Sequence, residues 1–155
     1  MLPARNRMRR SADYRAAVRT GRRVGRASLV LHLAAEQTST EPARVGFVVS
    51  RAVGPAATRN LVKRRLREAV RARITELPPG CLAVVRANPA AASASWPVLS
   101  GDLNSALDRA LDRALATTAG RQAASSAGSS VSSAGSSVSS AGSVQGSPAA
   151  ADGGA

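Results

Sequence analysis

The sequence is poor in the side chains on which disulfide-stabilised proteins and most enzymes depend. Its 155 residues include one cysteine and one histidine, which excludes an internal disulfide and a cysteine-based zinc site. Cys81 follows Pro78-Pro79-Gly80 and opens an apolar run, a context more typical of a small core residue than of a reactive thiol. His32 lies in an expected strand without a partner at a suggestive spacing, which favours a structural role over general-base catalysis.

Long apolar runs and recognisable catalytic motifs are also missing. No stretch is long and apolar enough to span a membrane, and the N-terminus lacks the apolar segment of a secretory signal. No Walker loop, dinucleotide fingerprint or metal-ligand spacing is present. Asp108 and Asp112 flank arginines in a helical pattern, which indicates a solvated face. We therefore expect no catalytic residue and no metal site in this chain, no membrane partner, and a cytoplasmic location.

Acidic residues are scarce in the first part of the chain. Residues 1–86 hold 19 Arg or Lys against 5 Asp or Glu, a net charge of +14, whereas residues 87–155 hold 3 against 4. A small domain with this charge repels itself unless a polyanion neutralises it. Nucleic acid is the first candidate for this polyanion, and an anionic membrane surface is the second candidate, which we do not expect to be the partner. Aromatic residues amount to only 2%, which favours recognition of a nucleic-acid backbone and shape over base stacking.

The most informative stretch is 58–77, which is predicted to form an amphipathic helix. Its apolar residues recur at spacings of three and four; they are Val62, Leu66, Ala69, Val70, Ile74 and Leu77. A second stripe is cationic or amide-bearing; its members are Asn60, Lys63, Arg64, Arg67 and Arg71. Glu68 and Glu76 are the only acids, and neither is expected to join this stripe. Because like charges at these spacings repel, the stripe favours an anionic partner over a merely solvated face.

The other elements follow from local patterns. A basic arm opens the chain, and Ser11 is expected to cap a helix that runs to Thr20. Strands are predicted over 22–26, 28–35, 44–50 and 82–87, and a last helix over 98–118. The strand at 44–50 is expected to be buried on both faces near its end. The succession of strand, central helix and strand predicts a βαβ unit with parallel strands.

Two compositional features complete this picture. Gly46 inside a strand predicts a close backbone approach or a bulge.

From Gly120 the chain becomes rich in Ser, Gly and Ala, and SSAGSSV occurs at 125–131 and again at 132–138. Such a composition cannot bury enough apolar surface to offset its ordering entropy. The interpretation is therefore one domain over 1–118 and a disordered tail over 119–155.

The central stretch contains the motif R-N-x-x-K-R-x-x-R, formed by Arg59, Asn60, Lys63, Arg64 and Arg67. This motif resembles the signature of the protein subunit of bacterial ribonuclease P. Its context is also similar: the RNR opening at 5–7, the short helix with Tyr14, LVLH, RVGFVVSRAVGPA before the signature, and VVRANPAA after it. The resemblance covers roughly residues 4–117.

The resemblance implies a fold and a partner. The fold is an α/β (α+β) two-layer sandwich of order αβββαβα, with helices packed on a four-stranded sheet and a left-handed βαβ crossover. The residues alone favour a right-handed crossover. The partners are ribonuclease P RNA, one protein per RNA, and precursor transfer RNA. The RNA is the catalyst, it binds most of the divalent metal (Mg²⁺), and the protein assists removal of the 5′ leader.

The resemblance also implies site residues. The RNA-binding set combines the signature, the basic stripe and their surroundings: Arg59, Asn60, Lys63, Arg64, Arg67, Arg71, Arg51, Arg5, Asn6 and Arg7. A leader cleft would be lined by Tyr14, Val18 and His32. The family often has aromatic residues at Val18, Leu29 and His32, and their absence implies weaker leader stacking. A general RNA- or ribosome-binding role is the alternative, and a single helix followed at once by a strand disfavours a DNA-binding module.

Overall fold

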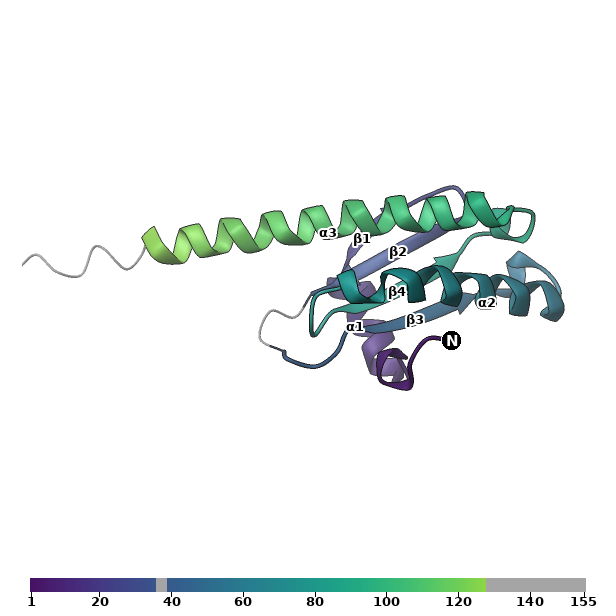
Figure 1. The fold of residues 1–155 in the computed structure, drawn as a ribbon, viewed down its shortest axis with the longest axis horizontal. Helices are drawn as coiled ribbons and strands as arrows, with labels where there is room; N and C mark the ends of the chain where they lie inside the picture. The colour runs from purple at the N-terminus through teal and green to yellow at the C-terminus, as the bar shows by residue number, and fades with distance from the viewer. Residues whose placement is uncertain (36–38, 128–155) are drawn as a thin grey trace, which may run out of the picture.

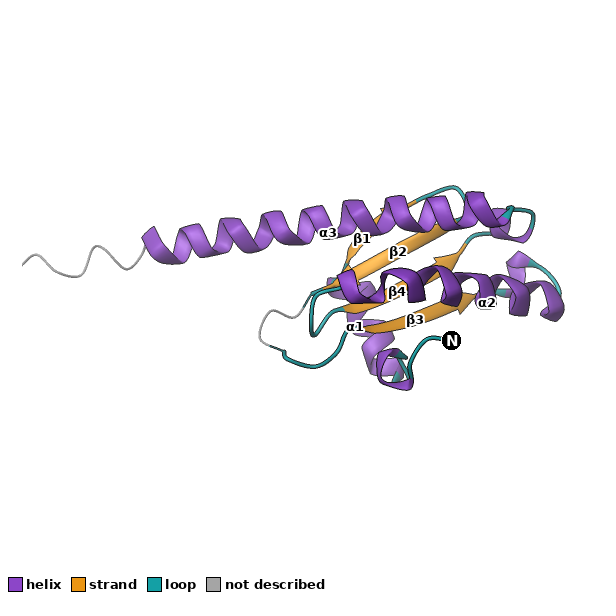
Figure 2. Ribbon diagram, in the orientation of Figure 1, coloured by secondary structure: helices purple, strands orange, loops and turns teal. Residues whose placement is uncertain are grey.

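A mixed four-stranded sheet lies at the centre of the computed structural model, which describes residues 1–35 and 39–127. Its strands are β1 (Arg22–Gly25), β2 (Leu29–Ala34), β3 (Arg44–Val49) and β4 (Leu82–Ala87). They lie in the order β1-β2-β4-β3 (Figure 2). Strand β4 pairs antiparallel with β2 and parallel with β3, as predicted for the βαβ unit.

Three helices pack on this sheet. They are α1 (Ser11–Thr20), α2 (Ala56–Arg73) and α3 (Trp96–Ala127), and short 3-10 turns lie at Ala4–Asn6, Arg51–Val53, Ile74–Glu76 and Pro89–Ala92. Helices α2 and α3 cover one face of the sheet, and α1 lies behind the other face (Figure 1). The expected order αβββαβα and the packing of helices on a sheet are thus confirmed. None of the described helices is both long and apolar enough to cross a membrane.

The connection from β3 through α2 to β4 is left-handed. The two strands point the same way side by side, from Arg44 opposite Leu82 to Val49 opposite Ala87. In Figure 1 both strands point to the right, β4 lies above β3, and α2 lies in front of them. The handedness implied by the family resemblance is therefore confirmed, and the general preference for right-handed crossovers does not hold here.

The core lies between the sheet and the pair α2 and α3. Leu29, Leu31 and Leu33 alternate along β2 and point into it, as expected for a strand with one apolar face. Helix α2 contributes Val62, Leu66, Ala69 and Val70, and α3 contributes Leu99, Leu103, Ala106, Leu107 and Ala110; all are buried. Burial of one such Leu or Val side chain contributes about 1.5–3 kcal/mol, so this contact sets the rotation of α2 about its axis.

Three local predictions are wrong in detail. Ser11 is the first residue of α1 rather than its cap, and no side chain caps the helix. Strand β3 is buried at its beginning rather than its end: Val45 is 2% exposed and Val48 36%. The reason is that Val45 belongs to the core cluster shared with α2 and α3, whereas Val48 lies on the opposite face of the strand. Helix α2 ends at Arg73, and Leu77 is buried beyond a following 3-10 turn.

Helix α3 is longer than predicted. It continues through 119–127, the first part of the predicted disordered tail, because Ala, Arg and Gln there favour helix and one Gly costs only about 1 kcal/mol. The helix runs past the end of the sheet (Figure 1). For that reason Leu115 of α3 is 62% exposed. The rest of the predicted tail, 128–155, lies outside the described residues.

The single thiol is expected to be inert in the folded protein. Cys81 is fully buried, and burial raises its pKa to about 12, so the reactive thiolate is absent at neutral pH. In a disulfide-exchange assay with an aromatic disulfide reagent, we expect reaction only at the rate of unfolding. One thiol should react at once in denaturant. Rapid reaction under native conditions would contradict the core assignment.

Candidate nucleic-acid interface

The polar face of α2 carries cations without acidic partners. Since Val62, Leu66 and Val70 are buried against the sheet, the residues on the opposite side of the helix are forced outward. Arg64 and Arg67 are exposed, and Lys63 is half-buried. Among the residues that the structure describes, these three cations make no ion pair. They are therefore free to bind an anion. Asn60 is exposed on the same helix.

The acids of α2 and of the turn that follows it are paired near the C-terminal end of the helix. Glu68 accepts from Arg71 at 3.1 Å, so the expectation that no acid joins the basic stripe is wrong for its last member. This pair is more than half exposed and contributes roughly 0–1 kcal/mol. Glu76 accepts from the Arg73 Nε at 3.0 Å, and this hydrogen bond is the chief reason that the pKa of Arg73 is raised and that of Glu76 lowered.

Arg73 also joins α2 to α3. Its Nη2 lies 2.6 Å from Asp108 Oδ1, and its Nη1 donates to the Asn104 carbonyl at 3.2 Å. Asp108, predicted to face solvent alone, therefore has a partner on α2. Arg65 is similarly engaged, because its Nη1 donates to the Ala94 carbonyl. These two arginines hold α2 to α3 and to the segment before it, which leaves Lys63, Arg64 and Arg67 as the outward cationic surface.

The N-terminal segment lies along the outer edge of β3. Met8 donates its backbone N–H to the Val45 carbonyl at 3.0 Å, and Arg7 bridges Val45. Asn6 is 7% exposed, and its Nδ2 donates to the Ala43 carbonyl at 2.7 Å. Its side chain therefore anchors the segment, and the contact of Asn6 with RNA stays a prediction. Arg5 and Arg7 remain exposed, with the Arg7 Nε donating to the Leu2 carbonyl at 2.9 Å.

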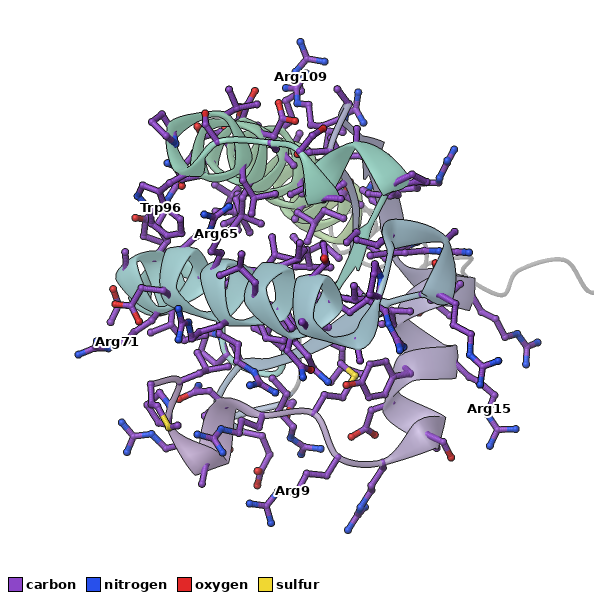
Figure 3. All side chains as sticks on the ribbon, turned by 90° about the vertical axis from the view of Figure 1, so that its right-hand side faces the viewer. Arg9, Arg15, Arg65, Arg71, Trp96 and Arg109 are labelled. Atoms are coloured by element: carbon purple, nitrogen blue, oxygen red, sulfur yellow. The ribbon has the colours of Figure 1, made fainter. Side chains whose placement is uncertain are left out.

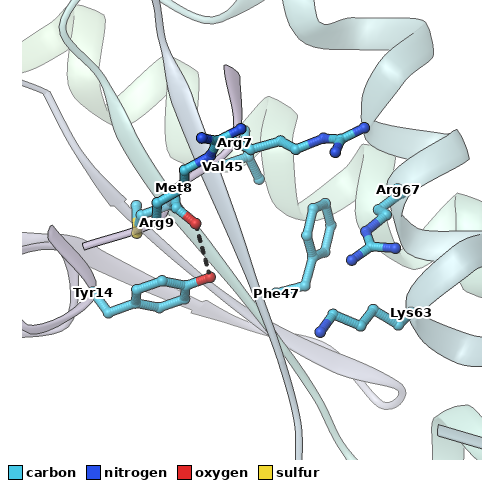
Figure 4. A pocket seen from close by; sticks show the side chains of 8 residues that line it. All are labelled: Arg7, Met8, Arg9, Tyr14, Val45, Phe47, Lys63 and Arg67. Carbon is cyan, nitrogen blue, oxygen red and sulfur yellow. Dashed lines mark hydrogen bonds between the residues drawn. The ribbon is translucent and has the colours of Figure 1, made fainter. Parts of the chain in front are cut away.

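This anchoring brings the basic arm beside α2. A cavity of about 200 Å³ lies where the segment, β3 and α2 meet; its lining residues are Arg7, Met8, Arg9, Tyr14, Val45, Phe47, Lys63 and Arg67 (Figure 4). Sequence reasoning missed Arg9 and Phe47. Strand alternation places Phe47 on the same face as Val45, but nothing in the sequence pattern shows that the N-terminal arm lies against this edge.

Two further residues of the predicted RNA-binding set, Arg51 and Arg59, lie before α2 and near its start. Arg51 is exposed in the 3-10 turn before the helix. Arg59 is half-buried, and its Nε is buried without a hydrogen-bond partner among the described residues. A buried nitrogen with no partner is costly, and an external acceptor would relieve that cost.

The expected cleft residues lie on the α1 side of the sheet but do not share one hollow. The Tyr14 ring covers Gly46, where an added Cβ would come within 2.4 Å of the ring, so the predicted close approach is confirmed. Val18, four residues later on α1, is 50% exposed. His32 lines a separate hollow of about 220 Å³ with Arg23 and Arg86, near the ends of β3 and β4.

His32 is held as a neutral group between cations. Arg23 stands directly opposite it on β1, and burial, followed by the charges of Arg23 and Arg86, lowers its pKa. Its Nδ1 is buried without a hydrogen-bond partner among the described residues. Together with the exposed Arg86, the hollow offers two guanidinium groups and an imidazole edge at the sheet surface.

The geometry and the comparisons with known proteins point the same way. The family model described as Ribonuclease P matches residues 2–111. The chain belongs to this family. The span includes every strand, α1, α2 and the part of α3 that packs on the sheet. The family assignment thus covers the whole cationic surface described above.

Curated relatives and solved structures agree with the assignment. The chain is 53% identical over 116 residues to the ribonuclease P protein component of Streptomyces avermitilis, covering 70% of this chain and 94% of that one. It is 50% identical over 131 residues to the ribonuclease P protein component of Pseudarthrobacter chlorophenolicus, covering 84% of this chain and 93% of that one. The ribonuclease P protein of Thermotoga maritima superimposes with a TM-score of 0.58 at 25% identity, over 68% of this chain and 97% of that chain.

Family membership defines the role. The chain is the protein subunit of ribonuclease P, the ribonucleoprotein endonuclease of transfer-RNA 5′ processing, and ribonuclease P RNA is its partner.

The lowered pKa of His32 predicts a stability change with pH. The folded state binds the imidazole proton less well than the unfolded state. The contribution of neutral His32 to the free energy of unfolding is therefore fully present above the unfolded pKa of about 6.5. It is lost as the pH falls from there through the lower folded pKa. The free energy of unfolding, measured with urea between pH 7.5 and 4.5, should therefore decrease in this window.

A matched variant isolates the effect. His32 is the only histidine, so the His32→Gln protein should show a flatter pH dependence between pH 7 and the onset of carboxylate protonation. An equal slope in both proteins would contradict the assigned environment of the imidazole.

Proposed function

We propose that the outward face of α2 binds the phosphate backbone of ribonuclease P RNA, and that the α1 side of the sheet binds the 5′ leader of precursor transfer RNA. The observation that carries this proposal is the set Lys63, Arg64 and Arg67, cations without ion pairs on a helix whose acids are paired elsewhere. Arg59, Asn60, Arg51, Arg71, Arg5 and Arg7 extend the same surface.

The proposed mechanism is electrostatic. Catalytic RNA and substrate leader are both polyanions, so their approach is opposed by repulsion and by their counterions. A domain with a net charge of +14 over residues 1–86 offers phosphate contacts to both and releases counterions from each. Bridging the two raises substrate affinity without any bond-breaking step by the protein's own side chains.

Leader binding is proposed for the hollow beside His32. Arg23 and Arg86 supply positive charge there, and Tyr14 and the exposed Val18 lie on α1 over the same face of the sheet. Only Tyr14 among the three expected cleft residues offers an aromatic ring. Contacts between arginine and the phosphate backbone of the leader therefore contribute more to binding than base stacking does. The leader is therefore held with little dependence on its sequence.

The divalent metal of the reaction is assigned to the RNA. Mg²⁺ is bound in proteins through carboxylates and other oxygens. Among the described residues, no three His, Cys, Asp or Glu side chains come together in a way that could hold a metal ion. This supports the proposal that the RNA binds most of the metal. We propose one protein per RNA in a cytoplasmic particle.

Stimulation of cleavage tests the processing role. Bacterial ribonuclease P RNA and a precursor transfer RNA are mixed at low magnesium, with and without this protein, and the rate of leader removal is measured. We expect the protein to increase cleavage, because it supplies charge neutralisation that magnesium otherwise provides. Binding of the RNA without any stimulation would instead favour a general RNA-binding role.

Substitution of the unpaired cations tests the interface. Arg64→Ala and Arg67→Ala should each weaken RNA binding and reduce the salt dependence of log Kd by about one per lost phosphate contact. Arg109→Ala is the matched control, because Arg109 is also an exposed helical arginine but lies on α3, away from α2 in Figure 3. The measurement is filter binding over a range of salt concentrations. If Arg64→Ala and Arg67→Ala show the same salt dependence of log Kd as the original protein and the control, the stripe does not bind phosphate.

A further inference from the structure

The cavity between the N-terminal segment and α2 has an unusual composition for a surface hollow. One wall is formed by Arg7, Met8 and Arg9, the opposite wall by Lys63 and Arg67, and Phe47 lies between them (Figure 4). These walls come from three elements that the fold holds rigidly: Met8 is hydrogen-bonded to β3, and α2 is packed on the sheet.

The charge of this cavity is uncompensated. Four of its lining residues are cations and none is acidic. Asp13, the acid next to Tyr14 in sequence, is turned to Arg44, whose Nη1 donates to its Oδ2 at 3.2 Å. Converging like charges raise the energy of the folded protein, and an anion seated among them removes that cost. The cavity therefore fits a phosphate group.

Phe47 adds a feature that a plain phosphate site does not need. The ring packs against the core with one side, yet the residue is only partly buried and lines the cavity. In Figure 4 the charged ends of Lys63 and Arg67 point toward the ring. An aromatic face beside cations is the combination that binds a nucleobase together with its phosphate.

The volume limits the ligand to one nucleotide unit. About 200 Å³ is below the roughly 300–1,000 Å³ of pockets that enclose drug-sized ligands. A single base or phosphate can enter, whereas a duplex cannot. Stacking on the ring also requires a base whose face is free, which is a property of unpaired nucleotides in RNA loops and bulges.

We propose that this cavity binds one unpaired nucleotide of ribonuclease P RNA, with its phosphate at Arg7, Lys63 and Arg67 and its base on the ring of Phe47. This rests on the proposed function and adds to it a fixed point of attachment. The phosphate contacts along α2 tolerate sliding, but a base held in a pocket sets the register of the protein on the RNA.

The first experiment compares two aromatic-to-leucine variants. Phe47→Leu removes the stacking face but keeps an apolar side chain, and Trp96→Leu is the matched control. Trp96 is 41% exposed at the start of α3, across α2 from Arg9 in Figure 3. Phe47→Leu should weaken binding of ribonuclease P RNA roughly 5- to 100-fold with an unchanged salt slope, since no phosphate contact is lost. Trp96→Leu should bind like the original protein.

Two further variants separate stacking from charge and from folding. Lys63→Ala should weaken binding and also reduce the salt slope by about one. Phe47→Tyr keeps an aromatic face and should restore binding that Phe47→Leu loses. Thermal unfolding of each variant shows whether it is folded at the assay temperature. If Phe47→Leu is folded and binds as tightly as the original protein, the nucleotide pocket is overturned.

The second experiment needs no large RNA. Adenosine 5′-monophosphate and inorganic phosphate are titrated separately into the full-length protein, and amide chemical shifts are followed by NMR. We expect shifts at Phe47, Lys63 and Arg67, with tighter binding of the nucleotide than of phosphate. Equal affinity for both would overturn the stacking role of Phe47.

The two failures can be told apart. If the protein binds ribonuclease P RNA no better than an unrelated structured RNA of equal length, the proposed function fails, and the mononucleotide titration still judges the pocket. If it prefers ribonuclease P RNA but Phe47→Leu changes nothing, only the pocket fails.

Discussion

The burial of one side of α2 is the constraint on which the rest of the structure depends. Val62, Leu66 and Val70 must face the sheet, because exposing any one of them would cost about as much as several surface ion pairs contribute. Because this burial fixes the rotation of α2, the side chains of Lys63, Arg64 and Arg67 lie on the side of the helix away from the core. The hydrophobic core thus maintains a repulsive cationic surface that the helix would not favour alone.

A second, smaller constraint determines what lies beside that surface. The buried amide of Asn6 and the backbone bond from Met8 to Val45 hold the N-terminal arm against the edge of β3. Without these contacts the arm would be a solvated basic segment. With them, the arm and α2 form opposite walls of one cavity, and the edge strand is protected from pairing with another chain.

Much of the fold could be predicted from periodicity, because each element's pattern matches its final environment. The alternation of leucines in β2 and the 3.6-residue spacing in α2 report burial directly. The errors arise where an element leaves the core. Val48 lies on the face of β3 opposite the core, and α3 continues past Gly120 because its end depends on local helix propensity rather than packing. Glu68 pairs with Arg71 because both side chains are long enough to bridge neighbouring positions on the helix surface, and the angular position of each residue alone does not show this.

By itself, the sequence determined the two-sided character of α2, the excess of positive charge and the family signature, because these are properties of spacing and composition. Only the tertiary structure decided that Asn6 anchors the N-terminal segment, that Arg73 pairs with Asp108 of α3, and that Phe47 lines one cavity with Arg9 and Lys63. These facts join residues that are distant in the chain. Their contacts follow from how the layers pack, which no local pattern encodes.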